Sequence, residues 1–345
     1  MNGRMISFLV CMLVLVSTVG PVSTSVLVER TSHSLMSGNI LYVGGNGPNN
    51  YTKIQDAVDN ASSGDTVFVF DESSPYVENI MINTSLSLIG EDKETTIING
   101  STNTSSENWT LNFGVWVAAD NVTVRGFTIQ YCNLSGILIS SNNNSITDNI
   151  LLDDFYGIAI GYGNEFQPPS SQYKGYNTIT NNLIIRDDVG IYVAGGWSNI
   201  ITGNIISETV SGIMLVGSMN SNISLNIISK NDGGIDIWAS YNTVVYRNNI
   251  SSNKNGVSTY FTSAVKILQN NFIGNNKNAE STQWLLWRIQ LFKNELNLPL
   301  RRNVWNGNYW NGPRSLPYII PASGLFLRFR FQVDWHPAKI PYDIP

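Results

Sequence analysis

The chain has 345 residues, of which 42% are apolar and only 13% are charged, and its formal net charge is −5. An ordinary globular domain has about 25% charged residues. Here Asn, Ser, Thr and Gly take their place, which favours strands and turns over a helical bundle. The negative charge argues against nucleic acid as a partner.

The first 25 residues have the three parts of a secretory signal, namely Arg4, the apolar run from Ile6 to Val16 and small residues up to Ser25. The run is shorter than the ~20 residues of a membrane span, so we expect cleavage near Ser23 to Ser25 rather than an uncleaved anchor. Residues 26–39 are then a linker. Cleavage leaves Cys132 as the single cysteine, which excludes an internal disulfide and a cysteine metal cluster.

We therefore expect a secreted or cell-surface protein and, after cleavage, no transmembrane segment. Its many Asn-x-Ser/Thr sequons support export, and we expect some of them to carry glycan. They are Asn50, Asn60, Asn83, Asn99, Asn103, Asn108, Asn121, Asn133, Asn143, Asn222 and Asn249.

Residues 40–120 are predicted to form an N-terminal cap and the first coils of a repeat structure. In the segment YTKIQDAVDNASSGDTVFVF, Ile54, Ala57 and Val58 lie on one face of a short helix that precedes a strand. Such a cap covers strand edges that are prone to aggregation when a stack of coils leaves them open.

Residues 121–280 repeat with a period of 22. Apolar residues recur in four columns, and between them lie Asn, Gly and Asp, so each unit supplies short strands and turns but no useful helix. The columns are Ile179, Ile201, Ile223, Val245, Ile267; Ile184, Ile206, Ile228, Ile250, Phe272; Ile191, Ile213, Ile235, Val257; and Val193, Leu215, Ile237, Thr259. Stacking such units predicts an all-β, right-handed parallel β-helix with three short sheets.

The same columns continue upstream through Ile146, Leu151, Ile158 and Ile160 if eleven extra residues are placed in the Pro- and Gly-rich stretch from Gly161 to Tyr176. A leucine-rich repeat has a similar period but requires an L-x-x-L-x-L frame that the chain lacks.

A polar column accompanies the apolar ones. Amides stacked about 4.8 Å apart can donate to one coil and accept from the other, so we interpret this column as a structural ladder at an inward-facing turn. Its members are Asn149, Asn182, Asn204, Asn226, Asn248 and Asn270. By contrast, we place Asn253 on an exposed turn. The recurrent Gly136, Gly157, Gly190, Gly212, Gly234 and Gly256 are expected to take positive φ or to allow close approach of the backbone.

Residues 281–345 are predicted to form a C-terminal cap rich in Trp and Tyr. The spacing of Trp284, Leu285, Trp287, Leu291 and Phe292 permits an amphipathic helix over residues 281–298 that packs on the last coil. Contact with a membrane surface is the alternative for this segment.

Several stretches of the chain resemble a known family. NYTKIQDAVDNASSGDTVFVF, YVENIMINTSLSLIGEDKETTIING and VTVRGFTI, together with NGNYWNG, PYII and VDWHPAKIPYDIP near the end, resemble pectin-lyase-like β-helix proteins, and in particular the NosD-like exported repeat proteins common in archaea. The resemblance covers most of residues 40–345 and implies a parallel β-helix. This fold hosts lyases, hydrolases, epimerases, esterases and plain surface proteins, so it implies no one activity.

The chain also departs from its relatives. NGPRSLP stands where archaeal members often have an acidic, calcium-like loop, and no segment matches the catalytic carboxylates of pectin methylesterases. The resemblance therefore transfers no catalytic residue.

Acidic residues precede the recurrent glycines and form one candidate site. Asp154 and Asp187 align across the insertion, and Arg186 lies beside them, so one turn is predicted to present a row of carboxylates. Such a row suits acid–base chemistry on a glycosidic bond or a Ca²⁺ site for elimination from a uronide, whereas the simpler interpretation is that Asp favours turns. The catalytic candidates are Asp153, Asp154, Asp187 and Asp188.

A second candidate is a face that holds Tyr192, Met214, Asp236 and Ser258 beside Val216, Trp238 and Tyr260. Aromatic rings next to a carboxylate suit sugar binding if they point outward, and packing against the stretch from Gly161 to Tyr176 is the alternative. The carbohydrate-binding candidates are Asp232, Asp236, Trp238, Tyr260, Tyr192 and Trp197.

The leading hypothesis is a monomeric, exported, non-catalytic protein that binds polysaccharide or another component of the cell envelope. The alternatives are a polysaccharide lyase or glycoside hydrolase that uses the Asp row, and a copper-maturation accessory protein. Copper is disfavoured because the exported part has only His33, His336 and Cys132 as soft-metal ligands and no Met cluster. We expect no cofactor other than a possible Ca²⁺.

Overall fold

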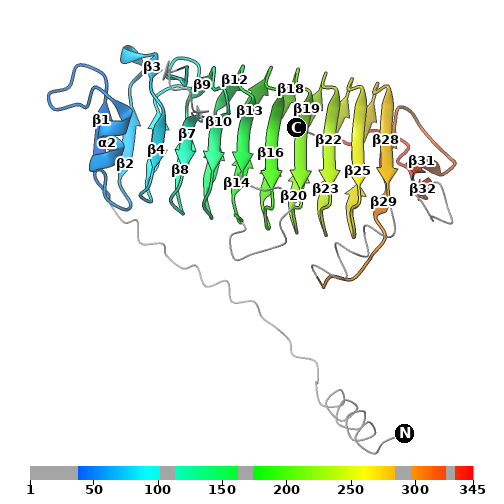
Figure 1. Cartoon of the computed structure of the whole chain (residues 1–345). Helices are drawn as coiled ribbons and strands as arrows, with labels where there is room; N and C mark the ends of the chain where they lie inside the picture. Colours follow the sequence, from blue (N-terminus) through cyan, green and yellow to red (C-terminus); the bar gives the residue numbers. More distant parts are fainter. Residues whose placement is uncertain (1–37, 102–112, 162–173, 284–296, 324–330, 345) are drawn as a thin grey trace, which may run out of the picture. The chain divides into compact units, whose positions relative to one another are not determined.

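The computed structural model describes residues 38–101, 113–161, 174–283, 297–323 and 331–344. These residues form a right-handed parallel β-helix whose coils each contribute a strand to sheets A, B and C in turn (Figure 1). The predicted signal and nearly all of the predicted linker lie outside the described residues, as does most of the predicted helix over 281–298. Among the described residues, no helix has the length and apolarity needed to cross a membrane.

Sheet A contains β1 (Ile40–Val43), β2 (Thr66–Val69), β5 (Ser87–Gly90), β8 (Thr123–Arg125), β11 (Ser145–Thr147), β14 (Thr178–Thr180), β17 (Ile200–Thr202), β20 (Asn222–Ser224), β23 (Val244–Tyr246), β26 (Lys266–Leu268), β29 (Val304–Asn306) and β32 (Phe331–Asp334). Sheet B contains β3 (Tyr76–Val77), β6 (Ile97–Asn99), β9 (Thr128–Gln130), β12 (Ile150–Leu152), β15 (Leu183–Ile185), β18 (Ile205–Ser207), β21 (Ile227–Ser229), β24 (Asn249–Ser251), β27 (Asn271–Ile273) and β30 (Tyr309–Trp310). Sheet C contains β4 (Ile80–Ile82), β7 (Phe113–Val117), β10 (Ser135–Ile139), β13 (Tyr156–Ile160), β16 (Val189–Ala194), β19 (Ser211–Val216), β22 (Gly233–Trp238), β25 (Asn255–Tyr260), β28 (Lys277–Thr282) and β31 (Tyr318–Ser323). The helical elements are α2 (Ile54–Asn60) and the short η1 (Asp71–Ser73).

The register confirms the predicted period. Ile206 pairs with Ile228, which pairs in turn with Ile250, a step of 22 residues each time. Ile146 pairs with Ile179, a step of 33, so the eleven extra residues lie between β13 and β14 as predicted.

The predicted apolar columns form the interior of the coils. All members of the four columns are 0% exposed, including Thr259. Because strands of successive coils pair directly, each side chain lies over its counterpart, and burial of each Ile or Val contributes about 1.5–3 kcal/mol. One unit exposes its apolar face unless a second unit covers it, which explains why the repeat is needed for the fold.

The predicted Asn ladder forms at the turn between sheets A and B. The turn residue before each ladder position takes a positive φ, as at Leu225 (57°) and Arg247 (52°), and the following Asn is buried. Asn226 shows the pattern: its Nδ2 donates to Oδ1 of Asn248 (2.9 Å) and to the carbonyl oxygen of Ile201 (3.0 Å). We call this the first-corner column; it comprises Asn149, Asn182, Asn204, Asn226, Asn248, Asn270 and Asn308.

A second column of inward-facing polar residues lies at the turn between sheets B and C. We call it the second-corner column; it comprises Cys132, Asp154, Asp187, Thr209, Asn231, Asn253 and Asn275, all at most 7% exposed. The prediction that Asn253 lies on an exposed turn is therefore wrong. Asn253 is 1% exposed, and its Nδ2 donates to Oδ1 of Asn275 (3.1 Å) and to the carbonyl oxygen of Ile228 (3.0 Å). It follows Ser252, whose φ is +56°, just as Asn248 follows Arg247 at the first corner.

The recurrent glycines allow close approach of neighbouring coils, which is one of the two predicted roles. None of the six has a positive φ. A Cβ on Gly212 would lie 2.7 Å from the carbonyl oxygen of Gly234, and a Cβ on Gly234 would lie 2.4 Å from that of Gly256. The glycines therefore keep the strands of sheet C within pairing distance immediately after the second corner.

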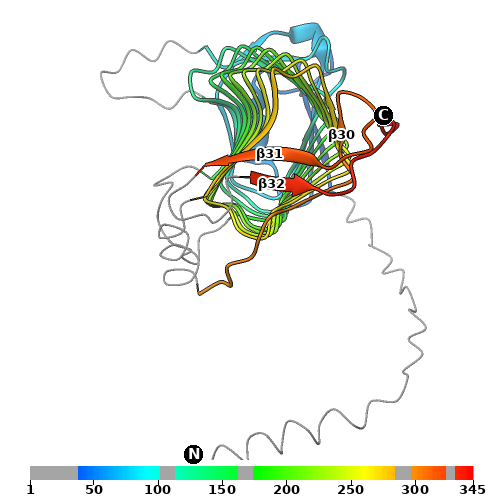
Figure 2. The same cartoon turned by 90° about the vertical axis from the view of Figure 1, so that its right-hand side faces the viewer.

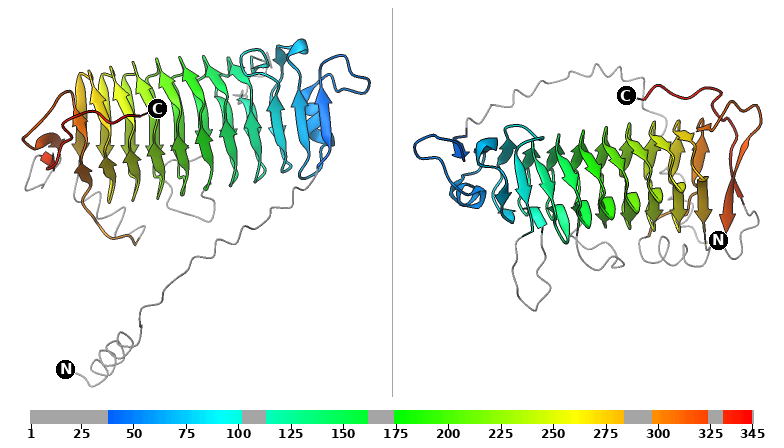
Figure 3. Two further views of the ribbon diagram at one scale, coloured as in Figure 1. Left: turned by 180° about the vertical axis from the view of Figure 1, so that it is seen from behind. Right: turned by 90° about the horizontal axis from the view of Figure 1, so that it is seen from above.

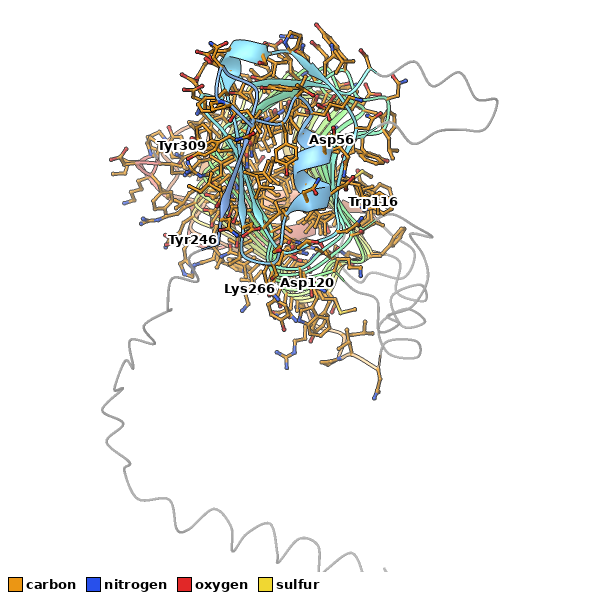
Figure 4. All side chains as sticks on the ribbon, turned by 90° about the vertical axis from the view of Figure 1, so that its left-hand side faces the viewer. Asp56, Trp116, Asp120, Tyr246, Lys266 and Tyr309 are labelled. Carbon is orange, nitrogen blue, oxygen red and sulfur yellow. The ribbon has the colours of Figure 1, made fainter. Side chains whose placement is uncertain are left out.

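The N-terminal end is covered by α2, which confirms the predicted short helix with Ile54, Ala57 and Val58 buried. Lys53 at the start of α2 provides no side-chain cap. Instead, the Glu78 carboxylate accepts hydrogen bonds from the backbone N–H groups of Ile54 (3.0 Å) and Gln55 (3.1 Å). Figure 4 shows α2 lying across this end of the coils.

The C-terminal end is closed by β31 and β32, which pair antiparallel and cross the last coil (Figure 2). β31 also pairs with β28 of sheet C, and β32 pairs with β29 of sheet A. The final segment then returns along sheet B (Figure 3), where the Tyr342 N–H donates to Oδ1 of Asn271 (2.8 Å).

Candidate functional site

The outer face of sheet C carries one aligned side chain per coil. Strand pairing places Tyr192, Met214, Asp236, Ser258 and Glu280 in a single row. Since alternate residues of a strand point to opposite faces, and the residues on both sides of each member of the row lie in the core, this row points away from it. We call this surface the sheet C face.

The sheet C face is apolar and aromatic over its N-terminal and central coils. Leu138, Ala159, Tyr192 and Val216 form a buried cluster that is separate from the main core. Partly buried residues pack against it; they are Phe113, Trp116, Tyr156, Val189, Ala194, Met214 and Trp238. Figure 4 places Trp116 on the opposite side of the coils from Tyr309 of sheet B.

Aromatic rings stack along the sheet C face from one coil to the next. The ring centroids of Tyr156 and Tyr192 are 4.8 Å apart, and those of Trp238 and Tyr260 are 4.0 Å apart. Each ring therefore covers one face of its partner. Tyr192 is only 4% exposed, whereas Trp238 and Tyr260 are partly exposed, so the Trp238–Tyr260 stack is the part of this row that a sugar can contact.

The sheet C face becomes polar toward its C-terminal coils. Ser211 Oγ donates to Oδ2 of Asp236 (2.8 Å). Two coils further on, Glu280 Oε1 accepts from the Tyr260 hydroxyl (2.9 Å) and from Ser258 Oγ (3.3 Å). Lys277 forms an ion pair with Oε2 of the same carboxylate.

The two carboxyl groups of this polar end differ electrostatically. Burial raises the pKa of Asp236, although hydrogen bonds from Ser211 and Ser258 oppose the shift. Burial acts in the same direction on Glu280, but hydrogen bonds from Lys277 and Tyr260 outweigh it and lower the pKa of that carboxyl. Burial and the Glu280 charge raise the pKa of Tyr260 to about 12. Asp236 therefore keeps its proton to a higher pH than an ordinary Asp, whereas Glu280 ionises at a lower pH than an ordinary Glu.

The structure brings four of the six carbohydrate-binding candidates onto the sheet C face, namely Tyr192, Asp236, Trp238 and Tyr260. The other two lie elsewhere. Asp232 is exposed on the turn before β22, and Trp197 is 37% exposed in the turn between β16 and β17.

Lys277 and Glu280, at the polar end of the sheet C face, were not among the predicted site residues. The signal that finds them is the same period, because 258 + 22 gives 280 and 255 + 22 gives 277. The predicted row ended one coil too early.

Asp154 and Asp187 align across the insertion as predicted, but they do not form an outward-facing row of catalytic carboxylates. Asp154 and Asp187 are only 5% and 3% exposed, because they occupy the second-corner column and point inward. The Asp153 carboxylate lies outside and pairs with Arg186 through two hydrogen bonds of 2.9 and 3.0 Å, and Asp188 is exposed. Adjacent residues at this turn point to opposite sides of the backbone, so the four carboxylates share no cleft.

The comparisons with known proteins decide the family. The family model described as "Periplasmic copper-binding protein (NosD)" matches residues 58–315, well over half of the chain. The chain belongs to the NosD family. No curated protein matches its sequence.

Solved structures show that this NosD-family chain shares its fold with other β-helix proteins. It is similar to the complex of XylC with xylose, with 11% identity, 87% of this chain and 85% of that chain covered, and a TM-score of 0.50. It is also similar to the Azotobacter vinelandii mannuronan C-5 epimerase AlgE4 A-module (13% identity, 83% and 95% covered, TM-score 0.41) and to an alginate lyase from Paenibacillus sp. str. FPU-7 (12%, 78% and 98%, 0.42). At these identities the likeness concerns the fold.

The described residues of this NosD-family chain do not fit a copper site. Within those ranges, no three His, Cys, Asp or Glu side chains converge to hold a metal ion. Cys132 is buried, and burial followed by the nearby Asp154 charge raises the pKa of its thiol, which disfavours the thiolate that copper requires. His336 is exposed, and its Nδ1 lies 3.1 Å from Oδ1 of Asn306. The family description therefore has no structural counterpart in the described part of the chain, and His33 lies outside it.

Proposed function

We propose that this NosD-family chain is an exported, monomeric β-helix protein that binds polysaccharide or another component of the cell envelope through the sheet C face, without catalysis. The observation that carries the proposal is the juxtaposition of stacked aromatic rings with the hydroxyl and carboxyl groups of the polar end. Aromatic side chains with one apolar and one polar region suit a sugar, which likewise has an apolar ring face and polar hydroxyl groups. The strands below hold these groups at fixed spacing, which lowers the entropy that binding must offset.

Further support comes from the family and from the fold neighbours. The family description places its members in the periplasm, which agrees with export. One structure of the same fold is described as a complex with xylose.

A second candidate function is glycoside hydrolysis with Asp236 as acid and Glu280 as base. It is favoured by the opposite pKa shifts of the two groups. Two coil steps of about 4.8 Å place the strands that carry them ~10 Å apart, close to the ~6.5–9.5 Å carboxyl separation of inverting glycosidases. Against this role, Glu280 is already engaged by Lys277, Tyr260 and Ser258.

The test is a panel of neutral and uronic-acid glycans, with and without Ca²⁺, in which retention on immobilised glycan and release of reducing ends are both measured. We expect retention without turnover. Trp238→Ala should weaken binding at least about tenfold, since loss of a stacked aromatic anchor costs on the order of 2 kcal/mol. Trp197→Ala is the matched control because it removes a partly exposed Trp outside the sheet C face.

Equal binding by wild type and Trp238→Ala would reject the sheet C face as the binding surface. Turnover that disappears in Asp236→Asn and in Glu280→Gln would establish the second candidate instead. Thermal unfolding of each variant checks that the coils remain intact.

A further inference from the structure

Two carboxyl groups are enclosed in the second-corner column, where neither candidate function uses them. The Cys132 N–H donates to Oδ1 of Asp154 (2.6 Å), and the Asp154 N–H donates to Oδ1 of Asp187 (2.8 Å). The other carboxyl oxygen of each, Oδ2, is buried and has no hydrogen-bond partner. A buried carboxylate oxygen without a donor is costly, because it has lost its water and gained nothing.

The amides in the same column show what these positions require. Nδ2 of Asn231 donates to the carbonyl oxygen of Ile206 (3.4 Å) and to Oδ1 of Asn253 (3.1 Å). Asn253 and Asn275 repeat the bond to a carbonyl oxygen of the preceding coil at 3.0 and 2.9 Å. The outer atom of the side chain is thus a donor in every Asn coil. An ionised Asp has no hydrogen to donate, whereas a protonated one does.

Among the residues that the structure describes, no cation forms an ion pair with either carboxyl. Arg186 lies on the adjacent turn position, but its guanidinium is paired with Asp153 on the outside. In the described part of the chain, the titratable groups around the column also include the Cys132 thiol, which is buried with them, and the exposed Tyr131, Asp188 and Glu208. Burial, and then the charge of Asp187, raise the pKa of Asp154 well above its usual range. Burial raises the pKa of Asp187 to about 8, against the opposing hydrogen bond from the Asp154 N–H.

We propose that Asp154 and Asp187 are neutral carboxylic acids that form a proton-dependent joint between the coils of β12–β13 and β15–β16. In the protonated state each Oδ2–H replaces the amide donor of the Asn coils and keeps the column continuous. Loss of the protons places two negative charges one above the other in the interior and opens this part of the β-helix. Since the adjoining strands Tyr156–Ile160 and Val189–Ala194 carry part of the sheet C face, the joint makes the order of that surface depend on pH.

The direction follows from proton linkage. In the unfolded chain an Asp titrates at about 3.9, below its value in the folded protein. The stabilising contribution of each protonated carboxyl is therefore fully present below about pH 4 and is lost as pH rises through the folded value, which is about 8 for Asp187. Between these two pH values, the ratio of unfolded to folded protein rises about tenfold per pH unit for each carboxyl that is protonated only in the folded state.

The test compares wild type with the double variant Asp154→Asn/Asp187→Asn, which installs the residue already present at Asn231 and Asn253. We expect the wild-type unfolding midpoint to fall steadily between about pH 5 and pH 9 and the midpoint of the double variant to fall far less. Asp232→Asn, an exposed change two coils beyond Asp187, is the control and should follow wild type. Parallel pH profiles of wild type and the double variant would overturn the proposal.

A direct measurement keeps the proposal testable if the double variant does not fold. Infrared absorption distinguishes a protonated carboxylic acid from a carboxylate, and the acid band shifts in D₂O. We expect wild type near about pH 6 to show an acid band, above the usual range for Asp. The band should shrink in each of the single variants Asp154→Asn and Asp187→Asn but not in Asp232→Asn. A wild-type spectrum without an acid band at that pH would refute the neutral carboxyls outright.

Discussion

The two corners of each coil solve the same geometric problem with different chemistry. At the first corner, an unbroken series of amides runs from Asn149 to Asn308, and each Asn both donates to and accepts from its neighbours. At the second corner, amides occupy only the C-terminal coils, and Thr209, Asp187, Asp154 and Cys132 replace them toward the N-terminus. The backbone turn is the same, since a positive-φ residue precedes both Asn226 and Asn231.

This difference shows which hydrogen bonds are formed at both corners and which depend on the residue type. Asn149 and Asp154 both accept the backbone N–H of the preceding coil through Oδ1, at Phe127 and Cys132 respectively. The second polar atom of the Asn side chain, Nδ2, is a hydrogen-bond donor, whereas the second oxygen of an ionised Asp is not. The amides of the first corner carry no titratable proton, whereas the two carboxyls of the second corner do. Predictions that act on one corner, on the other or on both test this distinction.

The largest expected effect removes the support shared by both corners. Ile206 lies in sheet B between them, and its carbonyl oxygen accepts from Asn231. Ile206→Asp places an unpaired charge between stacked coils and should cost roughly 3–5 kcal/mol or more. Ile205→Asp is the control, because Ile205 is 44% exposed on the opposite face of the same strand. A denaturation midpoint of Ile206→Asp equal to that of Ile205→Asp would contradict the assignment of the columns.

The second-largest effect is expected from replacing Asp334, which ends the first-corner column by accepting hydrogen bonds from Asn308. Asp334 is 0% exposed, and its Oδ2 accepts from the Asn308 N–H (2.9 Å), Asn308 Nδ2 (3.1 Å) and Trp310 Nε1 (3.0 Å). Asp334→Ala leaves these buried donors without their acceptor, and we expect a total cost of about 3 kcal/mol once the end of the coil has relaxed. Hydrogen exchange should show loss of protection at Asn308 and Trp310 first, with the second corner unaffected. Asp343→Ala, at an exposed position, is the control and should leave protection unchanged.

A change specific to the second-corner side should have a smaller effect. A Cβ on Gly212 would lie 2.7 Å from the carbonyl oxygen of Gly234 and 2.8 Å from a methyl of Ile228. Gly212→Ala should therefore destabilise by about 1–3 kcal/mol through overpacking. Gly312→Ala is matched, since nothing lies within 4 Å of its Cβ. If the two glycine variants melt together, the coils have room to separate and close approach is not required.

The sequence predicted the first-corner column from Asn149 to Asn270, although not Asn308, and did not predict the second-corner column. The reason is chemical. At the first corner only an amide serves both coils, so residue identity repeats every 22 residues and reveals the column. At the second corner, Cys, Asp, Thr and Asn follow one another along the chain at the corresponding positions, so no single residue type reveals the second-corner column. The two buried Asp residues were consequently interpreted as a catalytic row, and Asn253 as a surface residue.

The candidate site was predicted in part for a related reason. Tyr192, Asp236, Trp238 and Tyr260 are visible because they follow the period within the regular repeats. Whether such a row points inward or outward depends on the direction of each strand after the corner, which the spacing does not give. The hydrogen bonds that set the protonation of Asp236 and Glu280 come from neighbouring coils, so they become apparent only in three dimensions.

The last of the four predictions compares the two corners directly. Asn226→Ala removes the acceptor of the Asn204 N–H and Nδ2, at 2.9 and 3.0 Å, and Asn253→Ala does the same to Asn231 at 2.9 and 3.1 Å. Each variant also frees a carbonyl oxygen of a neighbouring coil, so each should cost roughly 1–3 kcal/mol, the desolvation cost of buried groups left without partners.

The control for both variants is Asn222→Ala, an exposed change on β20 that should stay within about 0.5 kcal/mol of wild type. Thermal melts of the unglycosylated proteins at one pH suffice for the comparison, because neither amide titrates. Suppose that Asn253→Ala is as stable as Asn222→Ala while Asn226→Ala is destabilised. The amides at the second corner would then add nothing to stability, and a protonated Asp would gain nothing by donating in their place. Equal losses at Asn226 and Asn253 would instead show that both corners depend on the same donor and acceptor pattern, and that Asp154 and Asp187 can satisfy it only while they carry a proton.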